Sequence, residues 1–149
     1  MRSNDQTQNL LQLAEQMALR VGDPLGSIPE SLLDEDWMMG FYCARNDVRA
    51  HFCSKVDKDP FNREDVAFVV AQAEGEADED DWVCFGRLWD GRWFALAAGC
   101  SYTGWEGGDL GGGTAFVGVT ANEVLNMGIS DSNFARLVPN SIERIFARV

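Results

Sequence analysis

The dipeptide Asp90-Gly91 constrains this chain more than any other stretch, because it joins two apolar runs, 82–89 and 92–98. Asp-Gly between such runs is a strong signal for a β-hairpin, since both residues tolerate the positive φ angles of a two-residue type I′ turn. A turn of that kind fixes the pairing of its two strands. The sequence therefore predicts a hairpin in which Trp89 faces Arg92.

The predicted register distributes the hairpin side chains between two faces of a sheet. One face carries Val83, Phe85, Arg87, Trp89, Arg92, Phe94, Leu96 and Ala98, and the other carries Trp82, Cys84, Gly86, Leu88, Trp93, Ala95 and Ala97. Both faces are largely apolar, so both require cover, and the small residues of the second face suit a closely packed helix. The same register predicts that Arg92 stacks on the Trp89 ring as a cation–π pair.

A third β-rich run follows the hairpin at 114–120. Together the three runs predict an α+β fold with a three-stranded antiparallel sheet, in the order 82–89, 92–98 and 114–120, packed with N-terminal and C-terminal helices. A long aromatic and glycine-rich loop, 99–113, separates the last two strands. It lacks the residue patterns of a phosphate-binding loop.

Helical patterns precede the hairpin. Apolar residues at three- and four-residue spacing predict an amphipathic helix over 4–21, and helical spacing recurs less regularly over 31–56. Asn62 and Asp65 resemble a capping box for a helix ending near Gly75. The β-branched content of that stretch leaves a strand as the alternative.

Helical signals also follow the third strand. Thr120 and Glu123 predict a capped helix through Met127, and Ser130 or Asp131 predicts another helical turn through Val138. An apolar stripe predicts a final helix over 139–149. We therefore expect a single domain over 1–149, with a mostly helical part at 1–60, a hairpin core at 61–138 and a C-terminal helix.

The chain is strongly acidic, with 24 Asp and Glu against 12 Lys and Arg and a net charge of −12. This balance argues against direct binding of nucleic acid through its phosphates, and it fits a protein partner with a basic surface. The N-terminus is polar, and no apolar run approaches the ~20 residues of a membrane helix. The sequence thus predicts a cytoplasmic protein that does not bind membranes.

The four cysteines, at positions 43, 53, 84 and 100, form no Cys-x-x-Cys pair, and the chain has a single histidine, His51. This spacing predicts neither a structural metal nor a disulfide. No residue pattern calls for a cofactor.

A series of short motifs resembles a group of small bacterial and phage proteins of unknown activity, over residues 64–138. The matching residues are Glu74, Gly75, Glu76, Trp82, Arg87, Leu88, Asp90, Gly91, Arg92, Gly99, Cys100, Tyr102, Thr103, Gly104, Trp105 and Glu106. Members usually read Cys-Asp-Tyr and then Trp-Asp-Cys, where this chain has Ser101 and Gly107. A role for a paired cysteine is therefore lost here. The resemblance implies a bacterial or phage origin and the boundary of the core, but no activity.

The first functional hypothesis is a non-catalytic protein-interaction module, such as an inhibitor, an adaptor or an assembly component. It rests on the acidic charge, the aromatic loop and the lack of any nucleophile–base pair, so no catalytic residue is assigned. Aromatic anchors with an acidic rim are the expected binding residues. These candidates are Tyr102, Thr103, Trp105, Glu106, Asp109, Trp89 and Arg92.

The second hypothesis is a small-ligand-binding or hydrolytic protein with its site in the loop from Cys100 to Asp109. Cys100 would be the nucleophile, and Glu106 or Asp109 would be the acid or base. A cysteine nucleophile needs a lowered pKa from a nearby cation or helix N-terminus, whereas its neighbours here are acidic. The first hypothesis is therefore preferred, and enzymatic activity is left open.

Overall fold

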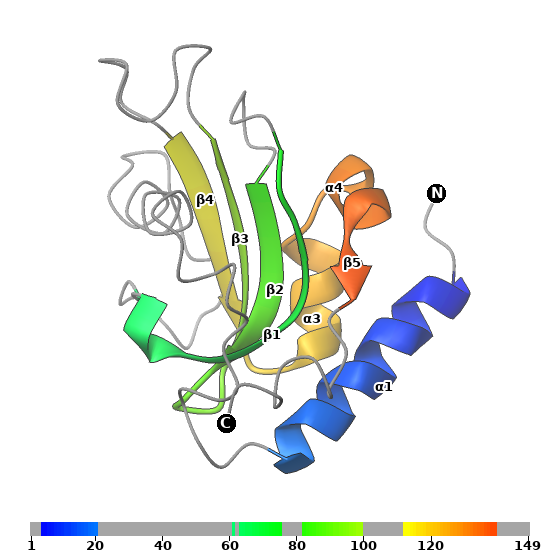
Figure 1. Ribbon diagram of the computed structural model, residues 1–149, viewed down its shortest axis with the longest axis vertical. Helices are drawn as coiled ribbons and strands as arrows, with labels where there is room; N and C mark the ends of the chain where they lie inside the picture. Colours follow the sequence, from blue (N-terminus) through cyan, green and yellow to red (C-terminus); the bar gives the residue numbers. More distant parts are fainter. Residues whose placement is uncertain (1–3, 21–60, 62, 76–81, 100–111, 140–149) are drawn as a thin grey trace.

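The computed structural model describes residues 4–20, 61, 63–75, 82–99 and 112–139. These residues form an α+β fold in which helices lie against one face of an antiparallel sheet (Figure 1). The sheet has five strands in the order β4-β3-β2-β1-β5. The elements are α1 (Asn4–Arg20), η3 (Arg63–Asp65), β1 (Val66–Ala73), β2 (Trp82–Leu88), β3 (Trp93–Gly99), β4 (Gly112–Gly118), α3 (Ala121–Met127), α4 (Asp131–Arg136) and β5 (Val138–Pro139).

The fold class and the antiparallel sheet agree with the prediction, and β2, β3 and β4 confirm the three predicted strands. The predicted number of strands is wrong, because the sheet continues through β1 and β5 on the far side of β2. The helix predicted over 31–56 lies outside the described residues, as do residues 140–149 of the predicted C-terminal helix and most of the loop at 99–113.

β1 corrects the helix predicted between Asn62 and Gly75 and confirms the alternative for this stretch, a strand. Its pairing with β2 shifts register between Val66 and Phe68 and again between Val69 and Ala71. A bulge adds one residue to a strand, so side chains three apart can then share a face. Val66 and Val69 do so in the same apolar cluster, and this spacing resembles that of a helix.

β5 corrects the helical turn predicted through Val138. α4 ends at Arg136, and Leu137 adopts extended φ and ψ angles of −62° and 130°. Pro139 disfavours a helical conformation at Val138, so the chain continues as an extended segment. β5 then pairs with Ala71 and Gln72 at the edge of β1.

The hairpin between β2 and β3 forms where predicted, but its register differs by one residue. Leu88 N–H donates to the Arg92 carbonyl oxygen at 2.8 Å, and Gly91 N–H donates to the Leu88 carbonyl oxygen at 3.1 Å. The turn therefore has three residues between the paired positions, with Gly91 at a φ of 95°. This geometry matches a type I turn followed by a glycine bulge, in which only the last residue needs a positive φ.

The one-residue difference exchanges the faces of β3 relative to β2. Phe85 lies opposite Ala95 rather than Leu96, and Arg87 lies opposite Trp93 rather than Phe94. The face assignments predicted for β3 are therefore wrong, although the alternation within each strand is correct.

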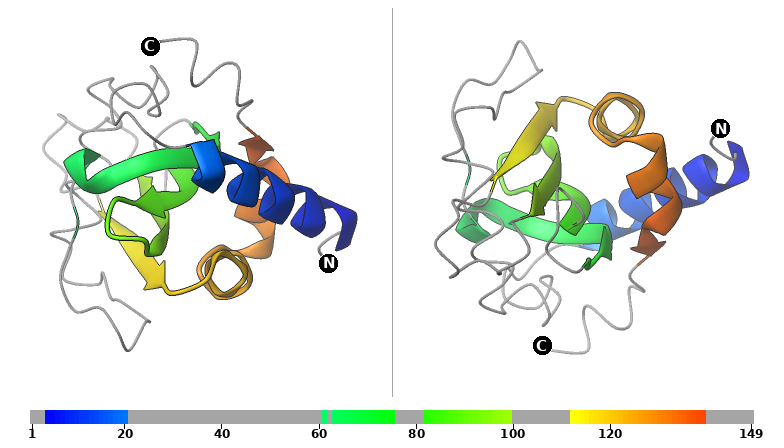
Figure 2. Two further views of the ribbon diagram at one scale, coloured as in Figure 1. Left: turned by 90° about the horizontal axis from the view of Figure 1, so that it is seen from below. Right: turned by 90° about the horizontal axis from the view of Figure 1, so that it is seen from above.

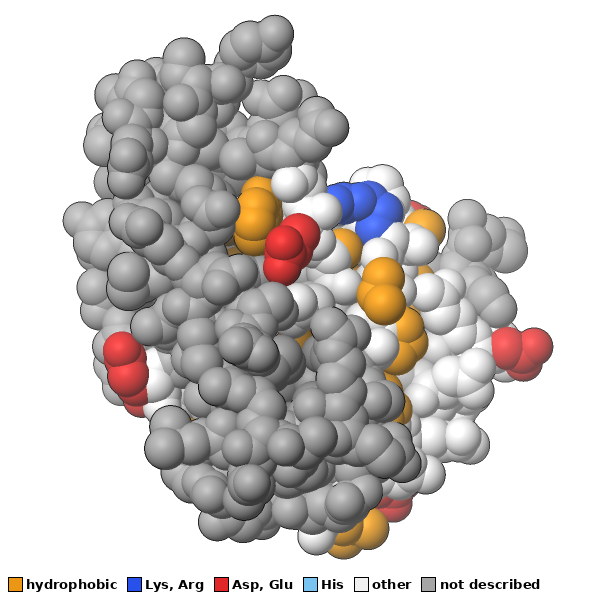
Figure 3. Space-filling view, viewed as in Figure 1, with side chains coloured by type: hydrophobic (Ala, Val, Ile, Leu, Met, Phe, Trp, Pro, Cys, Tyr) orange, Lys and Arg blue, Asp and Glu red, His pale blue; other side chains and the backbone are white. Residues whose placement is uncertain are grey.

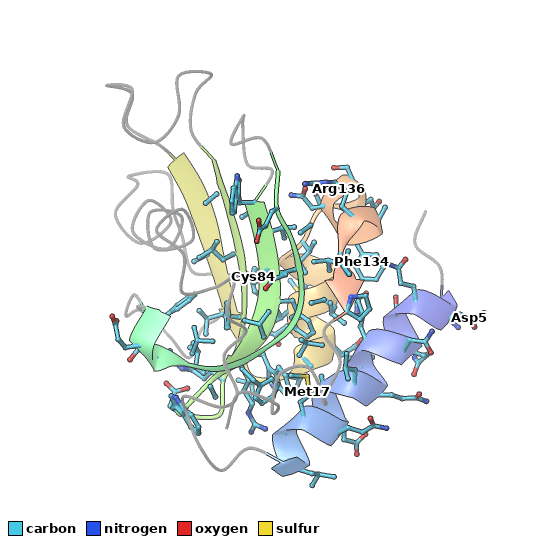
Figure 4. All side chains as sticks on the ribbon, viewed as in Figure 1. Asp5, Met17, Cys84, Phe134 and Arg136 are labelled. Atoms are coloured by element: carbon cyan, nitrogen blue, oxygen red, sulfur yellow. The ribbon has the colours of Figure 1, made fainter. Side chains whose placement is uncertain are left out.

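The helices α1, α3 and α4 lie on the same side of the sheet (Figure 2). α1 packs on β1 and α3, α3 packs on β3 and β4, and α4 packs on β1. Met17 and Phe134 point from the helices into this layer (Figure 4). The helix-covered cluster includes Leu10, Ala14, Met17, Phe68, Val83, Phe85, Trp93, Ala95, Phe116, Val124, Leu125 and Phe134.

Local hydrogen bonds fix the two short helices. Glu123 N–H donates to Thr120 Oγ1 at 3.1 Å, which confirms Thr120 as the N-cap of α3. Asn133 N–H donates to Ser130 Oγ at 3.2 Å, which selects Ser130 over Asp131 as the N-cap of α4. Gly128 ends α3 as predicted.

The opposite face of the sheet is also buried. Its cluster comprises Phe61, Val66, Val69, Trp82, Cys84, Leu88, Phe94, Leu96, Ala98, Ala115 and Val117. Phe61 and Phe94 pack with their ring centroids 5.0 Å apart. The expectation that both faces require cover is thus correct.

Candidate functional site at the hairpin end

The turn between β2 and β3 is stabilised by an ion pair between its own residues. Arg92 donates from its backbone N–H to Asp90 Oδ1 at 3.0 Å and from Nε to Asp90 Oδ2 at 2.7 Å. The side-chain hydrogen bond from Arg92 lowers the pKa of the Asp90 carboxyl below its ordinary value, against a smaller opposing effect of partial burial. Two donors from one residue fix the carboxylate in a single orientation.

Trp89, the first residue of the turn, is 40% exposed. Its backbone N–H donates to the Asp65 carbonyl oxygen at 2.9 Å, which ties the turn to η3. The backbone beneath this side chain is therefore held at both ends, by the turn and by η3. Trp89 and Arg92 both belong to the hairpin end, but the predicted pairing of Trp89 with Arg92 is wrong, because Arg92 pairs with Leu88. The stacking of Arg92 on Trp89 stays a prediction.

A cation–π pair lies next to the turn on the helix-covered face. The guanidinium carbon of Arg87 is 5.0 Å from the centroid of the Trp93 ring. Because Leu88 and Arg92 form a hydrogen-bonded pair, Arg87 and Trp93 form the adjacent non-hydrogen-bonded pair, in which side chains approach more closely. The Trp93 ring also contacts two phenylalanine rings, that of Phe85, stacked with centroids 5.9 Å apart, and that of Phe68, edge-on at 5.7 Å.

Arg87 is the residue of this region that sequence reasoning did not select. The predicted register paired it with Phe94, so its contact with Trp93 could not be foreseen. The observed register pairs Arg87 with Trp93, and Trp93 pairs on its other side with Gly118. If the three-residue turn had been predicted in place of the two-residue turn, the sequence would have placed Arg87 opposite Trp93.

Arg87, Trp93 and Gly118 form a row across β2, β3 and β4, and Glu123 lies at the Gly118 end of this row. A Cβ atom on Gly118 would be 2.7 Å from Glu123 Oε1, so the carboxylate lies directly over Gly118. Neighbouring strands are about 4.8 Å apart, which separates β2 from β4 by about 10 Å. Arg87 of β2 and the Glu123 carboxylate of α3, which lies over β4, are therefore on opposite sides of Trp93.

Cys84 is the one cysteine that the structure describes, and it is a free thiol. It is completely buried in the opposite-face cluster, and desolvation raises its pKa well above the ordinary value. A buried, protonated thiol is a poor nucleophile at neutral pH. Cys84 therefore serves as a packing residue.

The described part of the chain has no group of three His, Cys, Asp or Glu side chains that could hold a metal ion. No described helix combines the length and the apolar character needed to cross a membrane. On the face shown in Figure 3, the described acidic side chains lie apart from one another rather than in one patch.

Five of the predicted binding residues, Tyr102, Thr103, Trp105, Glu106 and Asp109, lie outside the described residues, as does Cys100. The hairpin end is thus the part of the predicted site whose geometry is defined. Comparison of the chain with protein-family models, with curated proteins and with solved structures gives no match.

Proposed function

We propose that this protein is a non-catalytic protein-interaction module that binds its partner through the hairpin end. The observation that carries the proposal is the partly exposed Trp89 side chain, whose backbone is held by hydrogen bonds within the turn and to η3. Tryptophan is enriched among the residues that dominate binding energies at protein interfaces. A rigid backbone beneath such a residue reduces the entropy lost on binding.

The surroundings of Trp89 support this role. The carboxylate of Asp90 is already paired with Arg92, so this acidic group needs no partner from another molecule. When the turn is buried against a partner protein, the negative charge of Asp90 therefore stays compensated by Arg92. The net charge of −12 favours encounter with a partner whose surface is basic overall.

The buried Cys84 gives no support to the competing hydrolytic hypothesis, because its thiol is protonated and enclosed. That hypothesis still has its proposed site in the loop from Cys100 to Asp109. An activity screen with ester and peptide substrates on the isolated full chain separates the two functions.

The test is capture of partners from the lysate of the source organism by the immobilised full chain and by Trp89→Ala. We expect the variant to lose specific partners while its melting temperature stays close to that of the wild type. Met127→Ala is the matched control, because Met127 is 69% exposed on α3 and its removal also deletes an exposed apolar side chain.

The proposal predicts normal capture by Met127→Ala and weakened capture by Trp89→Ala. Equal capture by both variants, with both folded, contradicts a binding role for the hairpin end. Turnover of a substrate by the purified chain contradicts the non-catalytic assignment.

A further inference from the structure

The guanidinium of Arg87 is positioned by the Trp93 ring, yet no carboxylate among the described residues pairs with it. The acidic residue of the same hairpin, Asp90, is engaged by two nitrogens of Arg92. Glu123, the acidic residue at the other end of the row, lies over β4. In a chain with twice as many acidic as basic residues, this arginine has no acidic partner in the part of the hairpin end that the structure describes.

We propose that Arg87 binds a side-chain carboxylate from an extended peptide segment of the partner, with an apolar neighbour of that carboxylate against Trp89. This inference rests on the proposed function and names the chemistry of the contact. Arg87 Nη2 would be 3.6 Å from a Cβ atom on Gly91, so the guanidinium reaches back to the turn that carries Trp89. The absence of a side chain at Gly91 leaves this approach open.

The geometry favours a carboxylate for a physical reason. A guanidinium is planar and presents paired N–H donors that match the two oxygens of a carboxylate. Stacking on Trp93 already restricts the Arg87 side chain, so binding costs less conformational entropy than it would for a free arginine.

The charge of the whole chain selects among carboxylate ligands. A net charge of −12 repels nucleic acid and strongly acidic peptides, whose many charges would meet one guanidinium. A segment with a single carboxylate between apolar residues avoids this repulsion and also provides a contact for Trp89.

The experiment uses the ¹⁵N-labelled full chain, whose tryptophan indole N–H signals report on Trp89 and Trp93. The probes are the capped peptide Leu-Glu-Leu, its neutral isostere Leu-Gln-Leu, and sodium acetate. We expect saturable shifts at both indole signals with the Glu peptide and at least about tenfold weaker binding of the Gln peptide, the effect of losing one charge-assisted contact. Acetate at the same concentration should produce much smaller shifts.

Variants then test the residue itself. Arg87→Gln should remove the difference between the Glu and Gln peptides. Arg87→Lys keeps the charge but not the planar pair of donors, and should bind the Glu peptide more weakly than the wild type. A dispersed amide spectrum establishes that each variant is folded. If Arg87→Gln does not fold, the affinities of Arg87→Lys and the wild type for the Glu peptide are compared instead.

Three results would overturn the inference: no saturable shift with the Glu peptide, equal binding of the two peptides, or shifts from acetate as large as those from the Glu peptide. Its failure is distinguishable from failure of the proposed function. If Trp89→Ala abolishes partner capture while Arg87→Gln leaves it intact, the interaction role stands and the carboxylate assignment falls.

Discussion

Gly86 lies against the carbonyl oxygen of Phe68 so closely that a Cβ atom on Gly86 would overlap it. The same Cβ would be 2.9 Å from Cε1 of the Phe94 ring, which lies on the opposite-face side of the sheet. Glycine is required here because bulged β1 brings its backbone against β2 at this point.

We therefore expect Gly86→Ala to lower the free energy of unfolding by about 1–3 kcal/mol or more, the range for overpacked interiors. Urea denaturation monitored by tryptophan fluorescence measures the loss. Gly118→Ala is the matched control, because its new Cβ would first meet the flexible carboxylate of Glu123 rather than backbone. An equal or larger loss for Gly118→Ala would contradict this explanation.

Thr120→Ala should destabilise the protein by about 1 kcal/mol, because it removes the oxygen that accepts a hydrogen bond from Glu123 N–H. Chemical denaturation of both proteins at one pH gives the difference. Thr120→Ser retains the accepting oxygen and should stay close to the wild type. A loss in Thr120→Ser as large as in Thr120→Ala would mean that the threonine methyl group, not the cap, matters.

Cys84 makes stability depend on alkaline pH. The folded state raises the pKa of its thiol above the ordinary value of 9.0, so it holds the proton more tightly than the unfolded state does. The contribution is complete below about pH 9 and is lost above it, with a slope near 1.4 kcal/mol per pH unit.

Denaturation at several values between about pH 8 and pH 10.5 should show a steeper decline for the wild type than for Cys84→Ala. The difference between the two slopes isolates this thiol from the other titrating groups. Parallel declines in the two proteins would show that Cys84 is not the source.

Asp90 should titrate below its ordinary pKa of 3.8, because the folded hairpin provides hydrogen bonds from Arg92. The associated stability is present above the ordinary pKa and is lost as the pH falls through the lowered value. NMR titration of the Asp90 side-chain carbonyl carbon measures this pKa. In Arg92→Gln the value should return toward 3.8, and an unchanged low value would exclude Arg92 as the cause.

Much of the fold could be predicted because its signals are local. The Asp90-Gly91 pair located the hairpin, the cap at Thr120 located α3, and the stripe of Leu10, Ala14 and Met17 located α1. Each of these signals acts within a few residues, so no knowledge of tertiary contacts was needed.

The errors arise where distant contacts override local patterns. β1 is buried at nearly every position, so periodicity carries little information there, and its bulges imitate helical spacing at Val66 and Val69. β5 gains its strand conformation from pairing with β1, a partner more than sixty residues away. The proline at 139 was a usable local signal that the helix prediction overlooked.

The candidate site depended on one choice of turn. Trp89 and Arg92 were selected because they flank Asp90-Gly91, and they flank it whether the turn has two residues or three. Arg87 was missed because its cross-strand neighbour changes with the register. The local sequence around Asp90-Gly91 allows both a two-residue and a three-residue turn. The packing of side chains on the two faces of the sheet decides which turn forms.

The docking of α1 has a consequence for the order in which the molecule can assemble. α1 is synthesised before α3 and α4, yet its apolar stripe shares a cluster with Val124 and Phe134, and Gln6 Nε2 donates to the Phe134 carbonyl oxygen at 3.3 Å. Most of the stability of a helix in a protein comes from the packing of its apolar face against other elements. The docking surface of α1 is therefore complete only after more than a hundred further residues have been synthesised, so α1 docks long after its own residues are made.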